Sequence, residues 1–121
     1  MSKVNIDAAF AKFDGYWDPK IVAELNGQMV KLARLSGEFI WHSHAKEDEL
    51  FLVLDGVLEI HFRDRDTVTL CQGELAVIPR GVEHKPVARG QVRLMLFEPS
   101  GTINTGEIVD SRTRTNLDRL E

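Results

Sequence analysis

Apolar and polar side chains alternate along most of this chain. The clearest alternation follows Gly56 and runs through Leu58, Glu59, Ile60, His61, Phe62 and Arg63. A period of two places the apolar side chains on one face of a β-strand. Comparable short runs occur at 20–25, 28–35, 50–54, 67–70, 75–78, 82–87 and 92–97. Many short strands without a long helix predict an all-β fold, an antiparallel sandwich or barrel, in a single domain spanning residues 1–121.

Turn-forming dipeptides mark the ends of these runs. Asn26-Gly27 lies between the first two runs and is a strong hairpin signal, because both residues tolerate the positive φ of a tight turn. Other strands are predicted to end at dipeptides that contain glycine, which are Ser36-Gly37, Asp55-Gly56 and Arg89-Gly90.

The two ends of the chain follow other patterns. Residues 5–13 carry apolar side chains at helical spacing, and Asn5 or Asp7 is placed to cap a short N-terminal helix. The segment 100–106 is rich in turn formers, and we expect it to be a structured loop that covers one end of the barrel.

Composition narrows the class of protein. The 121 residues are 43% hydrophobic and 28% charged, which are values typical of a globular domain. A net charge of -4 argues against nucleic acid as a partner. No apolar run approaches the roughly 20 residues of a membrane span, and the N-terminus lacks the apolar segment of a signal peptide. With Cys71 as the single cysteine, and predicted to be inert, these features predict a soluble, cytoplasmic protein.

Three of the four histidines, together with one glutamate, form a candidate metal site. His42 and His44 are one residue apart, so on a strand their side chains point to the same face with Cα atoms roughly 6.5–7 Å apart. Glu49 begins the next run, and His84 comes from a later one. If the barrel brings these runs together, three imidazoles and one carboxylate meet at one point. This donor set suits a divalent transition metal, namely Zn, Mn, Fe, Ni or Co.

The spacing of these residues resembles the two motifs of the cupin superfamily. The family's first motif is Gly, five residues, His-x-His, three or four residues, Glu, six residues, Gly. Here it reads Gly37, His42-Ser43-His44, Glu49 and Gly56, with the first gap one residue short. The family's second motif is Gly, five residues, Pro-x-Gly, two residues, His, three residues, Asn. Here it reads Gly73, Pro79-Arg80-Gly81 and His84, with Ala88 in the place of Asn.

The resemblance covers residues 37–88 and has implications for the fold, the metal site and its ligands. It implies a double-stranded β-helix, or jelly-roll barrel, with a metal inside its mouth. It also implies metal-ligand roles for His42, His44, Glu49 and His84. The Asn that Ala88 replaces is not a ligand in the family, so this departure leaves the site in place. The chain looks most like the small single-domain cupins grouped with mannose-6-phosphate isomerase-like proteins.

Other charged residues near the motifs have plainer interpretations. His61 shares the polar face of its strand and is expected to be a surface residue. Glu47 and Asp48 are alternatives to Glu49 as the ligand, but only Glu49 stands six residues before Gly56 as the motif requires. Arg80 and Lys85 are interpreted as surface charges, with contact to an anionic substrate as the alternative.

The leading functional hypothesis is a metal-binding cupin that acts on or binds a small polar metabolite, such as a sugar or an organic acid. The metal would serve as a Lewis acid, as in an isomerase, or as a centre that binds oxygen and substrate, as in a dioxygenase. No unassigned histidine remains near the motif to act as a general base, which leaves metal-bound hydroxide, Glu47, Asp48 or Glu83 for that role. A thiol dioxygenase is disfavoured, because these enzymes typically lack the motif glutamate that is present here.

Two alternatives remain at this point. One is a non-catalytic metabolite sensor that works with a protein partner, and the other is a barrel that keeps the four residues without holding a metal. A homodimer is expected in addition, because the run 50–54 is apolar on both faces and one face is left to be covered.

Overall fold

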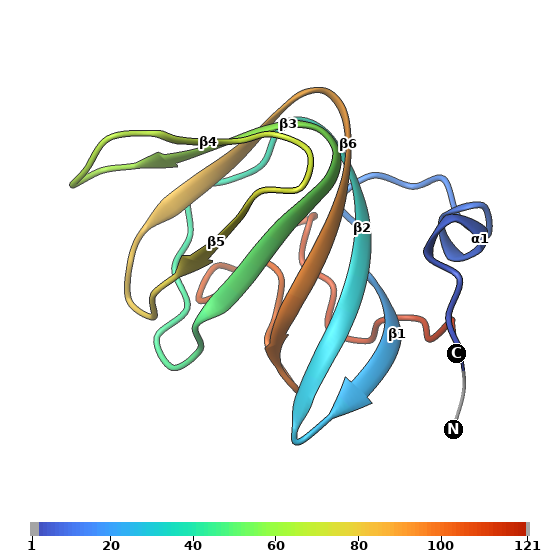
Figure 1. Cartoon of the computed structure of the whole chain (residues 1–121). Coiled ribbons are helices and arrows are strands. Elements are labelled where there is room, and N and C mark those ends of the chain that lie inside the picture. The colour runs from blue at the N-terminus through green and yellow to red at the C-terminus, as the bar shows by residue number, and fades with distance from the viewer. Residues whose placement is uncertain (1–2, 121) are drawn as a thin grey trace.

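The computed structural model describes residues 3–120 and confirms the all-β prediction (Figure 1). One short helix, α1 (Ile6–Phe10), precedes all the strands of the described chain. The strands are β1 (Lys20–Leu25), β2 (Gln28–Glu38), β3 (Glu49–Phe62), β4 (Val68–Leu70), β5 (Leu75–Ile78) and β6 (His84–Pro99). They pair antiparallel in the order β1-β2-β6-β3-β4, and β5 pairs with the first part of β3.

Strands β3 and β6 are longer than the sequence predicted. The prediction that strands end at Gly56 and Gly90 was wrong, because pairing between β3 and β6 continues on both sides of these residues. The pairing shifts register around Asp55, and both glycines have positive φ, 91° and 71°. A bulge with a left-handed glycine bends a strand without ending it. Ser36-Gly37 is likewise a register shift within β2 and not its end.

The predicted hairpin and the N-terminal helix are both present. Asn26 and Gly27 have φ of 51° and 75°, and they join β1 to β2 as a tight turn. Asn5 caps α1 by accepting a hydrogen bond from the backbone N–H of Ala8 at 2.9 Å. The helix is shorter than the predicted 5–13, because the residues after Phe10 continue as tighter turns with bonds to the third preceding residue.

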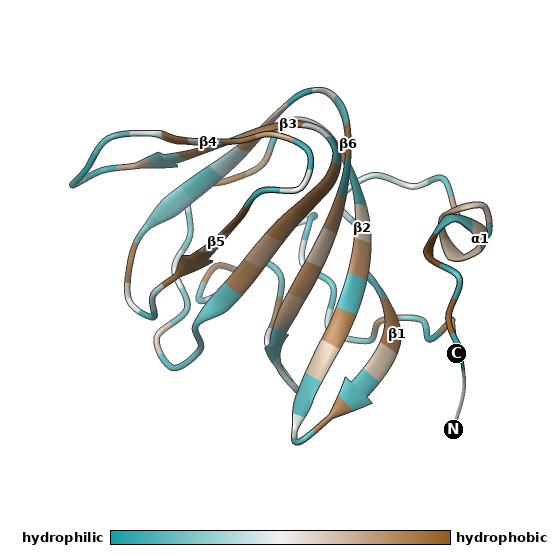
Figure 2. Ribbon diagram, in the orientation of Figure 1, coloured by the Kyte–Doolittle hydropathy of each residue, from teal (hydrophilic) through white to brown (hydrophobic). Residues whose placement is uncertain are grey.

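The core lies on both faces of the curved sheet. Inside the barrel, apolar residues of β2, β3 and β6 pack together, including Leu35, Phe51, Val53, Leu58 and Leu94. On the outer face, Phe10 of α1 packs against Val22 and Leu32 and covers that part of the sheet. Figure 2 shows the apolar bands that follow from this arrangement along β2, β3 and β6.

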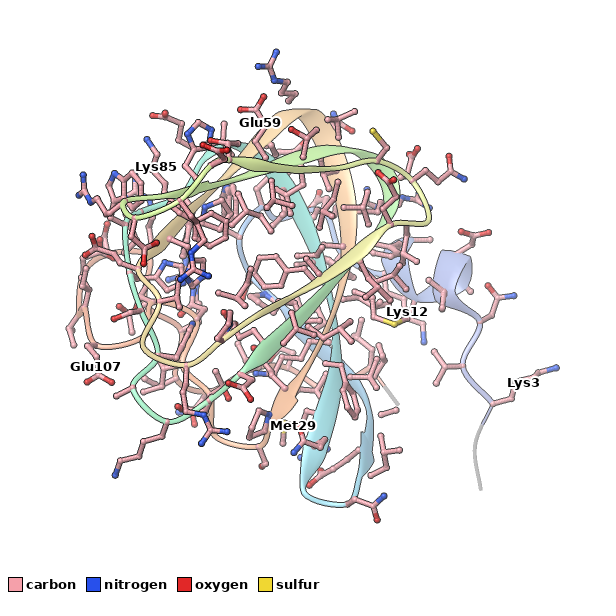
Figure 3. The ribbon with its side chains drawn as sticks, turned by 60° about the vertical axis from the view of Figure 1, so that its left-hand side comes forward. Lys3, Lys12, Met29, Glu59, Lys85 and Glu107 are labelled. Carbon is pink, nitrogen blue, oxygen red and sulfur yellow. The ribbon has the colours of Figure 1, made fainter. Side chains whose placement is uncertain are left out.

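The inner faces of β2, β3 and β6 position the site. Side chains alternate in burial along these strands, and the buried series on the inner face consists of Lys31, Ala33, Leu35, Glu49, Phe51, Val53, Leu94, Leu96 and Glu98. Figure 3 shows side chains filling the space between the strands, whereas Lys3, Glu59 and Lys85 lie at the periphery. Among the described residues, no helix is both long enough and apolar enough to cross a membrane.

Candidate metal centre

The four residues of the predicted metal site come from separate elements and meet inside the barrel. Glu49 is the first residue of β3 and His84 the first of β6, while His42 and His44 lie in the connection between β2 and β3. The backbones of His42 and His84 are joined by two hydrogen bonds, N–H to O at 3.0 Å and 2.9 Å. This bridge fixes the connection against the beginning of β6, so that both imidazoles enter the same space.

The candidate ligand atoms have distances that suit one metal ion. One nitrogen or carboxylate oxygen from each of the four residues lies within 4.8 Å of the others, and all four residues are buried. His44 Nε2 is 2.9 Å from Glu49 Oε1, and His84 Nε2 is 3.5 Å from the same oxygen. Ligands at about 2.1 Å from an octahedral metal stand roughly 3 Å apart when adjacent and about 4.2 Å apart when opposite. The geometry therefore fits a metal of this class.

Two of the imidazoles are oriented by backbone carbonyl groups. Nδ1 of His42 donates to the carbonyl oxygen of Ile40 at 3.0 Å, and Nδ1 of His84 donates to that of Val82 at 2.9 Å. In the neutral tautomer that makes this bond, Nδ1 carries the proton and Nε2 has a lone pair. Metal-binding histidines are held in this way, with the second nitrogen anchored outside the coordination sphere.

Three atoms of the cluster are buried without a hydrogen-bonding partner. They are Nε2 of His44, Nε2 of His84 and Oε1 of Glu49. His44 Nε2 and Glu49 Oε1 lie 2.9 Å from each other, and neither atom has a geometrically defined hydrogen-bonding partner. Leaving a buried polar atom unpaired costs about 1–3 kcal/mol, and such atoms are rare unless an ion or water serves them. A cation at the centre of the cluster would serve all three.

The local electrostatics place two of the four groups, His42 and Glu49, in the protonation states that a metal requires. Burial lowers the pKa of His42 to about 4, and the neighbouring His84 adds to this effect, so its imidazole is neutral at pH 7. Burial opposes ionisation of Glu49. Its contacts with His44, His84 and Glu98 outweigh burial and hold the pKa of this carboxyl well below its ordinary value. A neutral imidazole and an ionised carboxylate bind a cation without first losing a proton.

The lowered pKa of His42 predicts how the metal-free protein responds to acid. Between its unfolded pKa, 6.5, and its folded pKa, about 4, the unfolded chain binds a proton at His42 that the folded chain does not. Stability therefore falls as the pH falls through this window, by about 3 kcal/mol at pH 4. Urea unfolding of chelator-treated protein between pH 7 and pH 4 measures the effect. The His42→Gln variant should lack this part of the slope, and equal slopes in the two proteins would contradict the assignment.

A pocket adjoins the cluster on its inner side. It has a volume of about 50 Å³, and His42, Glu49, Glu98 and Asn104 are the polar residues of its wall. The remaining lining is apolar and consists of Trp17, Pro19, Ala33, Leu35, Phe39, Phe51, Pro86, Leu94 and Leu96. A mostly apolar hollow with a few polar groups is typical of a small-molecule site.

Sequence reasoning missed Glu98, although a signal for it was present. Leu94 and Leu96 face inward on β6, and a period of two extends the same face to Glu98. Its carboxyl group is buried, and Oε1 accepts a hydrogen bond from the buried Lys31 ammonium at 2.7 Å. Burial, and then the neighbouring Glu49 carboxylate, raise the pKa of Glu98 well above its ordinary value.

The charged residues around the motifs form ion pairs at the surface. Arg80 pairs with Asp48 at 3.2 Å and Lys85 pairs with Glu38 at 3.0 Å, in line with their interpretation as surface charges. Arg63 pairs with Glu83 at 2.7 Å. The pocket is lined by none of the three acids proposed as general bases, which are Glu47, Asp48 and Glu83.

The loop after β6 packs against the segment that carries His42 and His44. The backbone N–H of Glu107 donates to the carbonyl oxygen of Ser43 at 3.3 Å, and Thr105 is fully buried beside them. Gly106 sits so close that a Cβ atom at this position would overlap the Ser43 carbonyl group and contact the His42 ring. The predicted loop over one end of the barrel is thus present, and it braces the backbone between the two histidines.

Gly106→Ala is therefore expected to disturb the metal site. The left-handed φ of 61° costs an alanine about 1–2 kcal/mol, and the overlap with Ser43 adds about 1–3 kcal/mol. Gly101→Ala is the matched control, because Gly101 has a φ of 89° in the same loop and open space around it. Metal titration of both variants should show weaker binding for Gly106→Ala alone. Equal affinities would contradict a bracing role for the loop.

Comparison with known proteins identifies the family. Residues 28–98 match the family described as the Cupin domain, and this match spans more than half of the chain. The chain belongs to the cupin family. A crystal structure of a cupin-2 domain protein from Shewanella frigidimarina is 46% identical, with a TM-score of 0.77 over 79% of this chain and 93% of that one. A protein from Neisseria meningitidis is 30% identical, with a TM-score of 0.75 over 82% of this chain and 100% of that one.

These similarities confirm the jelly-roll cupin barrel that the sequence predicted. Among curated proteins, YdbB of Bacillus subtilis is 42% identical over 64 residues, which make up 53% of this cupin and 57% of that protein. The chain therefore spans a little over half the length of that relative.

Proposed function

We propose that this cupin holds one divalent transition metal, Zn, Mn, Fe, Ni or Co, and uses it to bind and act on a small organic molecule. His42, His44, Glu49 and His84 would be the ligands. The observation that carries the proposal is the set of unpaired atoms in this cluster, which are buried and lie at ligand-to-ligand distances around one point. Without a cation these atoms would only destabilise the fold.

The groups of the chain set the conditions for chemistry at this point. When bound, such a metal polarises an oxygen atom of a ligand or, if it is redox-active, supports oxygen chemistry. Glu49 carries the one negative charge among the proposed ligands. Phe39 and Phe51 belong to the apolar wall of the adjoining pocket, and an apolar wall strengthens electrostatic interactions beside it. An isomerase and a dioxygenase both fit these conditions.

The pocket wall favours one part of the predicted substrate range. A sugar presents a hydroxyl group on nearly every carbon, and each hydroxyl needs a partner when it is buried. The lining offers few such partners and many apolar side chains. An organic acid or a similar small molecule with one or two oxygen groups suits this wall better than a sugar.

Elemental analysis of protein purified without an affinity tag or added metal tests this proposal. We expect about one transition-metal ion per chain, with iron pointing to oxygen chemistry and zinc or manganese to Lewis-acid chemistry. Protein that contains no such metal, and takes up none on dialysis against Mn²⁺, Fe²⁺, Co²⁺, Ni²⁺ or Zn²⁺, would contradict the proposal.

We also propose that the cupin forms a homodimer through the outer face of β3 and β5. Leu50 pairs with Val77 and Leu52 with Leu75, so the four side chains share one face. Leu75 and Val77 are 56% and 54% exposed, whereas α1 covers a different part of the outer surface. A contiguous apolar patch of this kind suits contact with a second copy.

Sedimentation experiments test the dimer. The Val77→Glu variant should be a monomer, because it places a charge in the apolar patch. A wild-type protein that sediments as a monomer would contradict the proposed dimer.

A further inference from the structure

A second carboxyl group, that of Glu98, lies in the pocket beside the proposed metal site. Leu50 of β3 pairs with Phe97 of β6, so Glu98 stands opposite Glu49 across the two strands. Both carboxyl groups face inward and both line the pocket. Glu98 is therefore a neighbour of the cluster but not one of its four proposed ligands.

The Glu98 carboxyl group has one hydrogen-bond donor in the described part of the chain, Lys31, and its other close polar neighbour is the Glu49 carboxyl group. Oε1 accepts a hydrogen bond from Lys31 at 2.7 Å, and the same ammonium group donates to the carbonyl oxygen of Thr102 at 3.3 Å. Oε2 is buried and has no hydrogen-bonding partner among the described residues. With an exposed fraction of 3% for Glu98 and 2% for Lys31, solvent does not compensate.

A purely structural role does not account for this arrangement. A buried ion pair is seldom more stabilising than apolar side chains of the same size, and the neighbouring inward residues Ala33, Leu94 and Leu96 are apolar. An unpaired carboxyl oxygen adds a further cost. An unpaired carboxyl oxygen on a residue that lines a pocket is useful when a ligand brings a partner for it.

Asn104 is the remaining polar residue that the wall offers besides Glu98 and the proposed metal ligands, and its side chain is already hydrogen-bonded. Its Nδ2 donates to the carbonyl oxygen of Arg112 at 2.9 Å, and its Oδ1 accepts from the backbone N–H of Arg114 at 2.8 Å. Glu98 Oε2 is thus the group of the wall, outside the proposed metal ligands, that remains to recognise a polar atom of the ligand.

We infer that the pocket takes a small α-hydroxy carbonyl compound, with its carbonyl oxygen on the metal and its hydroxyl group hydrogen-bonded to Glu98 Oε2. The inference rests on the proposed metal site. A volume of about 50 Å³ has room for roughly three to five water-sized groups, which is the size of such a molecule. A hydroxyl group both donates and accepts, so the contact forms with either protonation state of the carboxyl. The apolar walls receive the carbon skeleton.

A pair of probes that differ by one group tests the inference. Hydroxyacetone and butanone have the same number of non-hydrogen atoms, but butanone has a methyl group in the place of the hydroxyl. Each is titrated into Co²⁺-loaded protein, and binding is followed by the visible absorption of the metal. We expect wild-type protein to bind hydroxyacetone about 10-fold more tightly, which is the effect of one hydrogen bond.

Variants of the buried pair assign the preference to Glu98. The double variant Lys31→Met/Glu98→Leu lacks both buried charged groups, including the carboxyl group proposed to bind the hydroxyl. It should still bind Co²⁺, but its preference for hydroxyacetone over butanone should disappear. Glu98→Gln, which can still hydrogen-bond a hydroxyl, should keep part of it. Equal binding of the two probes to wild type, or an undiminished preference in the double variant, would overturn the inference and leave the metal site standing. A wild-type protein that binds no Co²⁺ would overturn both.

Discussion

Replacing His44 with alanine is expected to remove the stabilisation that a metal gives to this cupin. A ligand that binds only the folded chain stabilises it by about 3–4 kcal/mol at 100 to 1,000 times its dissociation constant. His44 Nε2 is one of the unpaired buried atoms of the cluster, and its removal leaves two imidazoles and one carboxylate. At the same metal concentration, we expect the stabilisation of His44→Ala to be under about 1 kcal/mol.

Urea unfolding with and without Zn²⁺ measures this difference. The metal-free variant should still fold, because His44 lies in a connection outside the strands. His61→Ala is the matched control, since His61 is a half-buried histidine on β3 that pairs with Glu59 at 2.9 Å and lies outside the cluster. It should gain as much stability from Zn²⁺ as wild type does. An equal gain for His44→Ala would remove His44 from the set of ligands.

Replacing Lys31 with methionine is expected to destabilise the fold strongly. Removing one partner of a buried ion pair costs about 3–5 kcal/mol, because the other group keeps its burial and loses its compensation. The side chains of Lys31 and Glu98 are 3% and 4% exposed and lie 2.7 Å apart. Without Lys31, Glu98 folds most easily in its protonated form, so the cost should grow as the pH rises above the ordinary pKa of a glutamate.

The double variant Lys31→Met/Glu98→Leu separates the pair from its parts. Its stability should lie near that of wild type or above it, because apolar side chains replace both charges. Lys85→Met is the surface control. Lys85 pairs with Glu38, whose side chain is 66% exposed, and a loss of at most about 1 kcal/mol is expected. Denaturant midpoints of the four proteins give the comparison. A Lys31→Met protein within about 1 kcal/mol of wild type would show that the pair is not a buried charge interaction.

Much of the site could be predicted because its residues are encoded in local spacing. The His-x-His pattern and Glu49 lie within eight residues, and His84 follows a Pro-x-Gly turn. The bridge between His42 and His84 joins the two parts in space. Among the acids of this segment, Glu49 is the buried one that joins the cluster, while Asp48 pairs with Arg80 at the surface.

The remaining features depend on pairing between strands, which local patterns do not encode. A glycine with positive φ serves equally well in a turn that ends a strand and in a bulge that bends it, so Gly56 and Gly90 were misinterpreted. Glu98 looks like a charged residue at the end of a strand. The register of β3 against β6 places Glu98 opposite Glu49, and local patterns do not reveal this register. The hydrogen bond from Lys31, its diagonal neighbour on β2, offsets the cost of burying the carboxyl group.

Anomalous diffraction from crystals grown with Zn²⁺ would show directly whether the four residues hold a metal. We expect one strong peak inside the barrel, at about 2.0–2.2 Å from Nε2 of His42, His44 and His84 and from a carboxylate oxygen of Glu49. A peak bound elsewhere on the chain, or no peak at this position in crystals that contain the metal, would contradict it.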